Sequence, residues 1–217
     1  MAEGVFANLH ESLQKALDLR GWIPTPVQQV TQADIAAGLD RLVIAPTGSG
    51  KTMAAILPLL DRCLKNDWQG MSILYITPLR ALNRDVDRRL DEITKAVGLK
   101  LGLRHGDTTQ SERTKQVKNP PNLMITTPET FQLMFTGSRL RLLLKDVKAV
   151  VIDEIHEMAD GERGWQLSIG LTRLELFKGS SIQKIGLSAT VGNPDQVATW
   201  LSKKAKAISA KAPRYTE

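Results

Sequence analysis

Short apolar runs alternate with longer amphipathic stretches along this chain. Several of the runs are apolar at every position, as strands are when both faces of a parallel sheet are covered. The predicted strands lie at residues 42–45, 73–77, 99–104, 123–126, 149–152 and 184–187, with a further candidate at 205–209. Helical spacing of apolar residues predicts helices over residues 53–64, 79–97, 129–135, 166–177 and 194–201. The alternation indicates βαβ units, and therefore a single α/β domain with a mainly parallel sheet and helices on both faces.

The two ends of the chain extend this pattern in different ways. Leucines recur at helical spacing over residues 9–17, so we expect a first helix there that ends at Gly21. Pro24 and Pro26 frame the entry to the next helix. The final residues, 203–217, are basic and contain Pro213. We expect the domain to occupy residues 1–210 and residues 211–217 to begin a linker.

Length and composition exclude several classes of protein. The chain has 217 residues, a formal charge of +6, 42% hydrophobic residues and 24% charged residues, which is ordinary for a globular domain. No apolar run approaches the roughly 20 residues that a membrane span needs, and no secretory signal is visible. A single cysteine, Cys63, excludes an internal disulfide framework and a cysteine-based zinc site. We therefore expect a cytoplasmic protein without a membrane partner, and the basic charge fits a polyanionic one.

A glycine-rich segment between the first predicted strand and the helix after it has the composition of a phosphate site. Residues 45–52 read APTGSGKT. Gly48 and Gly50 allow a tight turn whose N–H groups and following helix terminus face an anion. Lys51 would contact the β- and γ-phosphates of ATP, and the Thr52 hydroxyl would contact Mg²⁺. The predicted nucleotide contacts in this segment are Thr47, Gly48, Ser49, Gly50, Lys51 and Thr52.

A second chemical motif follows the strand predicted at residues 149–152. Residues 149–156 read AVVIDEIH, so two carboxylates stand at the end of an apolar strand. The carboxyl edge of a parallel sheet is where α/β proteins bind ligands. Asp153 would hold Mg²⁺, partly through water, and Glu154 would orient and deprotonate an attacking water. Lys51, Asp153 and Glu154 are the predicted catalytic residues. The alternative is an acidic strand end that caps the next helix.

Six short motifs in this order resemble superfamily 2 nucleic-acid helicases of the DExH type. GWIPTPVQQ at 21–29 is similar to the Q motif, APTGSGKT to motif I, TPLRALNRD at 77–85 to motif Ia, TTPE at 126–129 to motif Ib, DEIH at 153–156 to motif II and SAT at 188–190 to motif III. Longer segments at 104–113, 119–130 and 185–194 resemble Lhr-type helicases, whose full-length members are prokaryotic DNA repair helicases. The resemblance implies a RecA-like P-loop fold, and it implies that Gln28 reads the adenine edge. An aromatic residue often stands about 17 positions before that glutamine; here the position is Glu11, and Phe6 fits core packing equally well.

The resemblance also implies where nucleic acid binds. Motif Ia contributes Thr77, Pro78 and Arg80, and motif Ib contributes Thr127, Pro128 and Glu129. Each Thr-Pro step opens a helix at a strand end, where N–H groups can contact phosphates without reading bases. Single-stranded or forked DNA is the expected partner ahead of RNA. Arg104, His105 and Asp107 stand on another strand-end loop and flank this track.

A coupling role is expected for the last residue of motif II. His156 could connect the nucleotide site to Ser188, Ala189 and Thr190 of motif III, and so link ATP state to grip on nucleic acid. The alternative is an ordinary hydrogen-bonded helix residue.

Together these features predict the ATP-binding motor domain of an ATP-dependent helicase. We expect a monomer, with a second RecA-like domain in cis. The segment after motif III contains no arginine-rich motif. In this superfamily the arginine that stabilises the transferring phosphate comes from the second domain, and its loss can lower the rate 10³–10⁵-fold. We therefore expect the chain alone to hydrolyse ATP barely above background. The alternative function is a nucleotide-regulated nucleic-acid-binding module without turnover.

Overall fold

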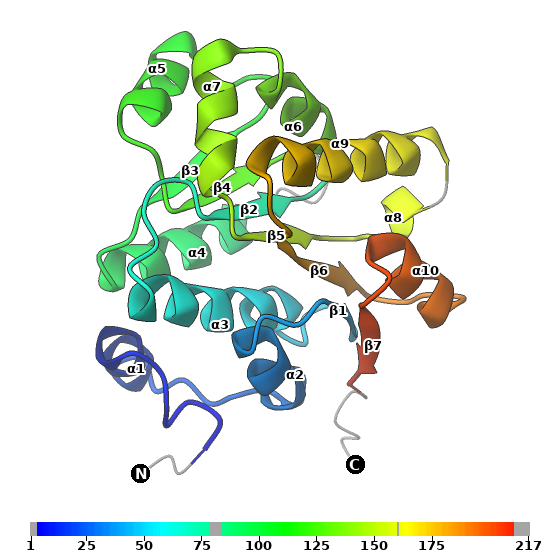
Figure 1. Ribbon diagram of the computed structural model, residues 1–217. Coiled ribbons are helices and arrows are strands. Elements are labelled where there is room, and N and C mark those ends of the chain that lie inside the picture. Colours follow the sequence, from blue (N-terminus) through cyan, green and yellow to red (C-terminus); the bar gives the residue numbers. More distant parts are fainter. Residues whose placement is uncertain (1–3, 79–83, 160, 211–217) are drawn as a thin grey trace.

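A computed structural model of the chain describes residues 4–78, 84–159 and 161–210. Its centre is a seven-stranded parallel sheet in the order β3-β4-β2-β5-β6-β1-β7 (Figure 1). The strands are β1 (Arg41–Ile44), β2 (Ile73–Ile76), β3 (Leu101–Arg104), β4 (Leu123–Thr126), β5 (Ala149–Ile152), β6 (Gln183–Ser188) and β7 (Lys206–Ser209). The predicted single α/β domain with a parallel sheet is confirmed, and the candidate last strand exists as β7.

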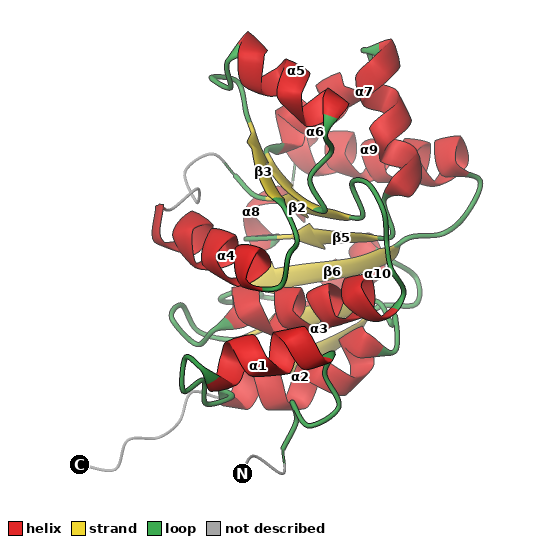
Figure 2. Ribbon diagram, turned by 90° about the vertical axis from the view of Figure 1, so that its left-hand side faces the viewer, coloured by secondary structure: helices red, strands yellow, loops and turns green. Residues whose placement is uncertain are grey.

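Helices cover both faces of this sheet, as Figures 1 and 2 show. The helices are α1 (Glu11–Asp18), α2 (Pro26–Ala36), α3 (Lys51–Lys65), α4 (Arg84–Ala96), α5 (Gln110–Lys118), α6 (Pro128–Met134), α7 (Ser138–Leu143), α8 (His156–Ala159), α9 (Glu162–Lys178) and α10 (Pro194–Leu201), with a short 3₁₀ turn, η2 (Leu144–Asp146). One apolar cluster packs α1 to α4 against the sheet, and a second packs α6 to α10 against the other face. The predicted helices on both faces are therefore confirmed.

The continuous apolar strands follow from this two-sided burial. In β2, Ile73 and Tyr75 lie in the cluster with α3, whereas Leu74 and Ile76 lie in the cluster with α9. Successive side chains of a strand point to opposite faces, so a strand covered on both sides has no polar position. Cys63 is buried in the first cluster, and burial raises the pKa of its thiol to about 11.

Some boundaries differ from the sequence-based expectation. The third strand begins at Leu101 rather than at residue 99, because the Leu99 N–H bonds the Thr94 carbonyl and closes the end of α4. Helix α5 was not predicted: it has no buried residue and hence no apolar periodicity. It begins instead with a capping box, in which Thr109 and Glu112 bond each other's backbone N–H groups.

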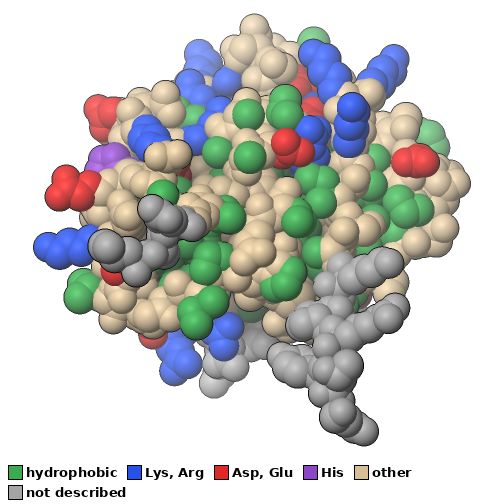
Figure 3. All heavy atoms as spheres, turned by 90° about the horizontal axis from the view of Figure 1, so that it is seen from below, with side chains coloured by type: hydrophobic (Ala, Val, Ile, Leu, Met, Phe, Trp, Pro, Cys, Tyr) green, Lys and Arg blue, Asp and Glu red, His purple; other side chains and the backbone are tan. Residues whose placement is uncertain are grey.

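None of the helices in the described part of the chain combines the length and the apolar character of a membrane span. Seen from the side of α1 and α2, hydrophobic side chains are scattered over the middle of the face and charged ones lie mainly around its margin (Figure 3). Leu19, Ile23 and Val30 on and around these two helices are exposed. Single exposed apolar side chains of this kind are normal for a globular surface.

Candidate nucleotide and nucleic-acid site

The carboxyl ends of the parallel strands gather the predicted motifs at one edge of the sheet. The phosphate loop follows β1, Asp153 follows β5, and Ser188 ends β6. Thr77 and Thr127 follow β2 and β4, so the nucleic-acid motifs lie farther along the same edge. Because strands β5 and β6 stand between β2 and β1, the two groups of motifs are neighbours rather than one site.

The loop before α3 has the backbone of an anion site. Gly48 and Gly50 have φ angles of 80° and 90°, in the left-handed region that glycine adopts without strain. Gly50 is the N-cap of α3, so the unpaired N–H groups of the first helical turn face the loop. The buried Ser49 hydroxyl has no hydrogen-bond partner among the described residues. A phosphate oxygen would give these donors the partner they lack.

Lys51 lies at the base of this loop. Its ammonium Nζ donates to the Ala45 carbonyl at 2.7 Å, and the side chain is buried. Burial lowers the pKa of Lys51, while the negative charges of Glu154 and Asp153 oppose that shift. The two carboxylates therefore lie near enough to influence Lys51, although none of the ion pairs among the described residues includes this lysine.

The Asp153 carboxylate is held by a residue that the sequence analysis did not single out. The buried Tyr75 hydroxyl donates to Asp153 Oδ2, and the Glu154 N–H donates to Oδ1 at 3.0 Å. Burial raises the pKa of Tyr75 well above its ordinary value, Asp153 adds to the rise, and the neighbouring Thr52 hydroxyl opposes it. Tyr75 thus joins Thr52 and Asp153, the two predicted Mg²⁺ ligands. A threonine hydroxyl and a carboxylate that both neighbour one tyrosine hydroxyl fit the oxygen-only, water-rich coordination of Mg²⁺.

Glu154 has an unusual backbone. Its φ is +47°, a left-handed conformation that is rare outside glycine, asparagine and aspartate. Burial raises the pKa of Glu154, as does the adjacent Asp153 charge, while Lys51 and His156 lower it. The hydrogen bonds that Asp153 accepts come from Tyr75 and Glu154, and none among the described residues comes from α8. The helix-capping alternative for Asp153 therefore lacks its defining contact.

Gln28 connects α2 to the phosphate loop. Its Oε1 accepts hydrogen bonds from the Trp22 indole and the Thr25 N–H, each at 3.1 Å, and its Nε2 donates to the Gly50 carbonyl at 3.4 Å. The side chain is buried. The sequence analysis did not predict that Trp22 orients Gln28. The signal was its position in the same motif, six residues before the glutamine. Phe6 is buried in the core cluster, which is the packing role considered for it.

Motif II contacts motif III as anticipated. His156 Nδ1 lies 2.9 Å from the Ser188 hydroxyl, which also donates to the Thr190 carbonyl at 2.8 Å. The same imidazole nitrogen lies 3.5 Å from the Glu154 carboxylate. A path of contacts therefore runs from the predicted base through His156 and Ser188 to the Thr190 carbonyl, whereas the Ala189 side chain has no polar atom that could take part in it.

Most described side chains of the predicted nucleic-acid motifs are less accessible to solvent than expected. The Thr77, Pro78, Thr127 and Pro128 side chains are buried, and Arg80 lies outside the described residues. The Thr127 hydroxyl accepts the Thr130 N–H at 3.3 Å and so caps α6. Glu129 is exposed and pairs with Arg163 at 2.7 Å. Any contact from these two threonines and prolines would therefore be made by the backbone.

Comparison with known proteins also points to a helicase domain. The family model of the DEAD/DEAH box helicases matches residues 25–197. The chain belongs to the DEAD/DEAH box helicase family. Its similarity to Lhr-type proteins is also confirmed: it is 43% identical to the "Lhr helicase/uracil glycosylase" of Escherichia coli over 199 residues, 82% of this chain and 13% of that protein. It is 38% identical to the "ATP-dependent helicase Lhr-Core" of Methanothermobacter thermautotrophicus, over 82% of this chain and 22% of that protein.

The solved structures agree with this family. The structure of Mycobacterium smegmatis helicase Lhr bound to ssDNA and AMP-PNP superposes on 97% of this chain and 28% of that one, with a TM-score of 0.86 and 36% identity. The predicted RecA-like fold is confirmed. This DEAD/DEAH box domain spans 13–22% of the two curated helicases named above, so it corresponds to a part of them.

Proposed function

We propose that this chain is the ATP-binding motor domain of a nucleic-acid-dependent helicase or translocase, with DNA as its polymer. The observation that carries the proposal is the hydrogen bond of Tyr75 to Asp153, near Lys51, beside a glycine-rich loop with the backbone of an anion site. The similar Mycobacterium smegmatis Lhr was solved with ssDNA and AMP-PNP, which supports both ligand classes. A role in DNA repair or recombination rests on the resemblance to Lhr-type helicases alone.

The residues divide the chemistry between them. The loop N–H groups and Lys51 would bind the β- and γ-phosphates, and Gln28 would read the adenine. Thr52 and Asp153 would hold Mg²⁺, which supplies charge neutralisation on the phosphates when bound. Glu154 would orient the attacking water and take its proton at the carboxylate, a task that a raised pKa suits. His156, which lies near both residues, would transmit a change in the position or charge of Glu154 to Ser188.

The domain is proposed to work with a second RecA-like domain in cis, joined through residues 211–217, which lie outside the described residues. That domain would supply the arginine of the transition state. The 217-residue chain should then bind ATP and hydrolyse it barely above background, with or without single-stranded DNA. A DNA-stimulated turnover typical of motor ATPases, measured on this chain, would contradict the proposal of an incomplete site. A nucleotide-regulated binding module remains the alternative function if the full-length protein shows no turnover either.

Two substitutions test the nucleotide site. Lys51→Ala should weaken binding of a fluorescent ATP analogue at least 100-fold, because it removes the charge that faces the phosphates. Glu154→Gln should leave that binding within about threefold of wild type and abolish hydrolysis in the full-length protein. Lys95→Ala, on the exposed face of α4, is the matched control for loss of a lysine. Equal binding by wild type and Lys51→Ala would refute the assignment of the loop.

A further inference from the structure

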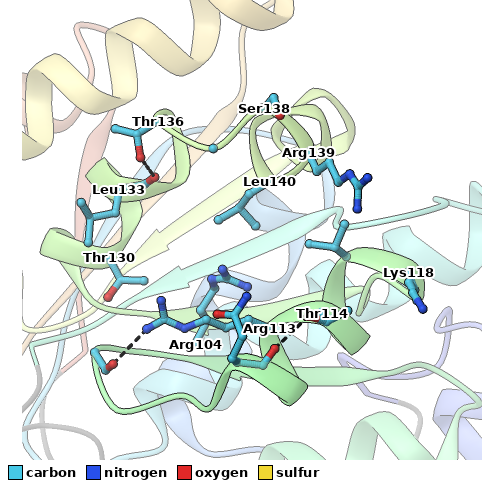
Figure 4. Close-up of a pocket in the computed structure, with 14 residues that line it drawn as sticks. Arg104, Arg113, Thr114, Lys118, Thr130, Leu133, Thr136, Ser138, Arg139 and Leu140 are labelled. Atoms are coloured by element: carbon cyan, nitrogen blue, oxygen red, sulfur yellow. Dashed lines mark hydrogen bonds between the residues drawn. The ribbon is translucent and has the colours of Figure 1, made fainter.

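A basic cavity of about 550 Å³ lies between α5, α6 and α7, beside the carboxyl end of β3 (Figure 4). Its charged lining residues are Arg104, Arg113, Lys118 and Arg139. No aspartate or glutamate lines it among the described residues. Hydroxyl groups of threonine and serine, including that of Thr130, complete its polar wall. A hollow with four cations and no carboxylate is electrostatically suited to an anion.

Arg104 is the most informative of these residues because it is 93% buried, with 7% of its surface exposed. Its guanidinium makes one hydrogen bond among the described residues, from Nη1 to Gln116 Oε1 at 3.1 Å. It takes part in none of the ion pairs of the described chain. Its remaining donors are not among the fully enclosed unpaired atoms of the described residues, so they can reach a ligand in the cavity that Arg104 lines. A largely buried charge without a counter-ion favours binding of an anion.

Arg113 adds a second charge beside it without neutralising the first. Its Nε and Nη2 donate to the carbonyls of Thr108 and Gly106, each at 2.9 Å, and so hold the loop after β3. Burial lowers the pKa of Arg104, and the Arg113 charge lowers it further. Arginine nevertheless stays protonated in proteins, so the two like charges remain in the cavity. Their repulsion is a second reason to expect a bound anion.

The position of the cavity indicates which anion. Thr130 lies in the first turn of α6, directly after Thr127–Glu129, the predicted nucleic-acid motif. Arg104 ends β3, the edge strand, whereas the phosphate loop follows β1 near the opposite edge. The cavity is therefore separate from the nucleotide site and continuous with the nucleic-acid side of the domain.

We propose that this cavity binds a phosphate group of the nucleic-acid strand that lies on motif Ib. Planar arginine forks and nearby hydroxyls match the tetrahedral oxygens of a phosphodiester, and they carry no base preference. The inference rests on the proposed function, since it names a further contact of the same polymer. Inorganic phosphate has the same chemistry, so the experiment must separate a strand phosphate from a small anion.

The first measurement compares two double variants of equal charge. Lys118→Gln/Arg139→Gln removes two exposed cations of the cavity. Lys115→Gln/Lys145→Gln removes two exposed cations that lie outside it on α5 and η2. Binding of a fluorescent oligothymidylate 12-mer by the 217-residue chain is followed by anisotropy at several salt concentrations. We expect the cavity variant to bind about tenfold more weakly, with a salt slope reduced by about 0.7 for the lost phosphate contact. The control should change binding less than threefold.

A second measurement identifies the phosphate itself. Neutral methylphosphonate linkages are placed singly along the 12-mer, and each is tested with wild type and with Arg104→Lys, which keeps the charge but removes the fork. One linkage should weaken binding to wild type and have little further effect on the variant, because both changes remove the same contact. If Arg104→Lys does not fold, as judged by its thermal transition, Lys118→Gln/Arg139→Gln takes its place in the scan.

Each remaining outcome overturns the inference in a distinguishable way. Additive effects at every linkage, or equal losses in the cavity and control variants, would show that the cavity holds no strand phosphate. A rise in Tm with inorganic phosphate that the cavity variant loses, without any coupled linkage, would assign the cavity to a small anion. Absence of oligothymidylate binding by wild type would refute the proposed function together with this inference.

Discussion

The two ends of the ligand-bearing edge are organised in opposite ways. On the nucleotide side, Lys51 lies near the charges of Asp153 and Glu154. Tyr75 bonds Asp153 of motif II, and Gln28 of the Q motif bonds the Gly50 carbonyl of motif I. On the nucleic-acid side, Arg104 and its neighbouring cations line a cavity to which no described residue contributes a carboxylate. The nucleotide side brings charges of opposite sign near one another, whereas the cavity on the other side gathers charges of the same sign.

This difference teaches how each side can respond to its ligand. A nucleotide must enter a network that already exists, so its phosphates exchange for internal contacts such as that of Lys51 with the Ala45 carbonyl. The exchange can therefore alter Glu154, His156 and Ser188, which belong to the same network. A nucleic-acid phosphate instead fills a cavity that lacks a counter-charge, so it adds affinity with less rearrangement. The following predictions test this comparison, from the largest expected effect to the smallest.

The largest effect is expected at Gly50, because the nucleotide side depends on close packing of its loop. A Cβ at this position would lie 2.8 Å from Gln28 Nε2, and the residue has a φ of +90°. Left-handed strain of about 1–2 kcal/mol and overpacking of a similar size should together destabilise Gly50→Ala by about 3 kcal/mol in urea unfolding. Binding of the ATP analogue should fall as well, since Gln28 would be displaced.

Gly48 provides the matched control. Its φ is +80°, but a Cβ there meets no atom within 4 Å. Gly48→Ala should therefore carry the backbone strain alone and lose about 1 kcal/mol in the same unfolding measurement. Equal losses for the two variants would mean that the contact between Gln28 and the loop contributes nothing, and the nucleotide side would then be less interlocked than described.

A somewhat smaller effect is expected at Tyr75. Tyr75→Phe removes the hydroxyl that donates to Asp153 and leaves the ring in the core. A hydrogen bond to a charged group contributes about 1.5–3 kcal/mol, so the free energy of unfolding near pH 8 should fall by about 2 kcal/mol. The concentration of Mg²⁺ needed for half-maximal binding of the ATP analogue should rise several-fold, because Asp153 loses its orientation.

The pH dependence and a second substitution separate this effect from general packing damage. Burial raises the pKa of Asp153, and the Tyr75 hydroxyl lowers it, so the variant raises this pKa further. A carboxyl whose pKa is raised by folding loses stability as the pH rises through that value, so the deficit of Tyr75→Phe should shrink as the pH falls from about 8 towards 4. In an Asp153→Asn background the same substitution should have less than half its effect. A deficit independent of pH and of Asp153 would assign Tyr75 a packing role only.

The sequence predicted the parts of this molecule that depend on local pattern. Continuous apolar runs predicted the strands, and APTGSGKT and DEIH predicted the nucleotide side, because their chemistry requires those residue types at short spacing. Tyr75 was not singled out: an aromatic residue in an apolar strand is normally core, and its partner is 78 residues away. Arg104 was predicted to flank the track, but its burial depends on α5, which has no apolar periodicity. Contacts between residues far apart in the sequence, and the helix α5 without apolar periodicity, could be found only from the structure.

The smallest effect concerns Glu129, the carboxylate of motif Ib. Its pair with Arg163 is exposed, so Glu129→Gln should change the free energy of unfolding by less than about 1 kcal/mol. It should nevertheless strengthen oligothymidylate binding about twofold, because Arg163 becomes available to a phosphate and a repulsive charge is lost. Glu162→Gln, an exposed change of equal charge in the first turn of α9, should leave that affinity unchanged. If both variants bind the oligothymidylate equally tightly, net charge alone accounts for the gain in affinity, and Glu129 has no special place beside the strand. If only Glu129→Gln gains affinity, removing a carboxylate improves binding on the nucleic-acid side. That outcome is the reverse of the one expected on the nucleotide side.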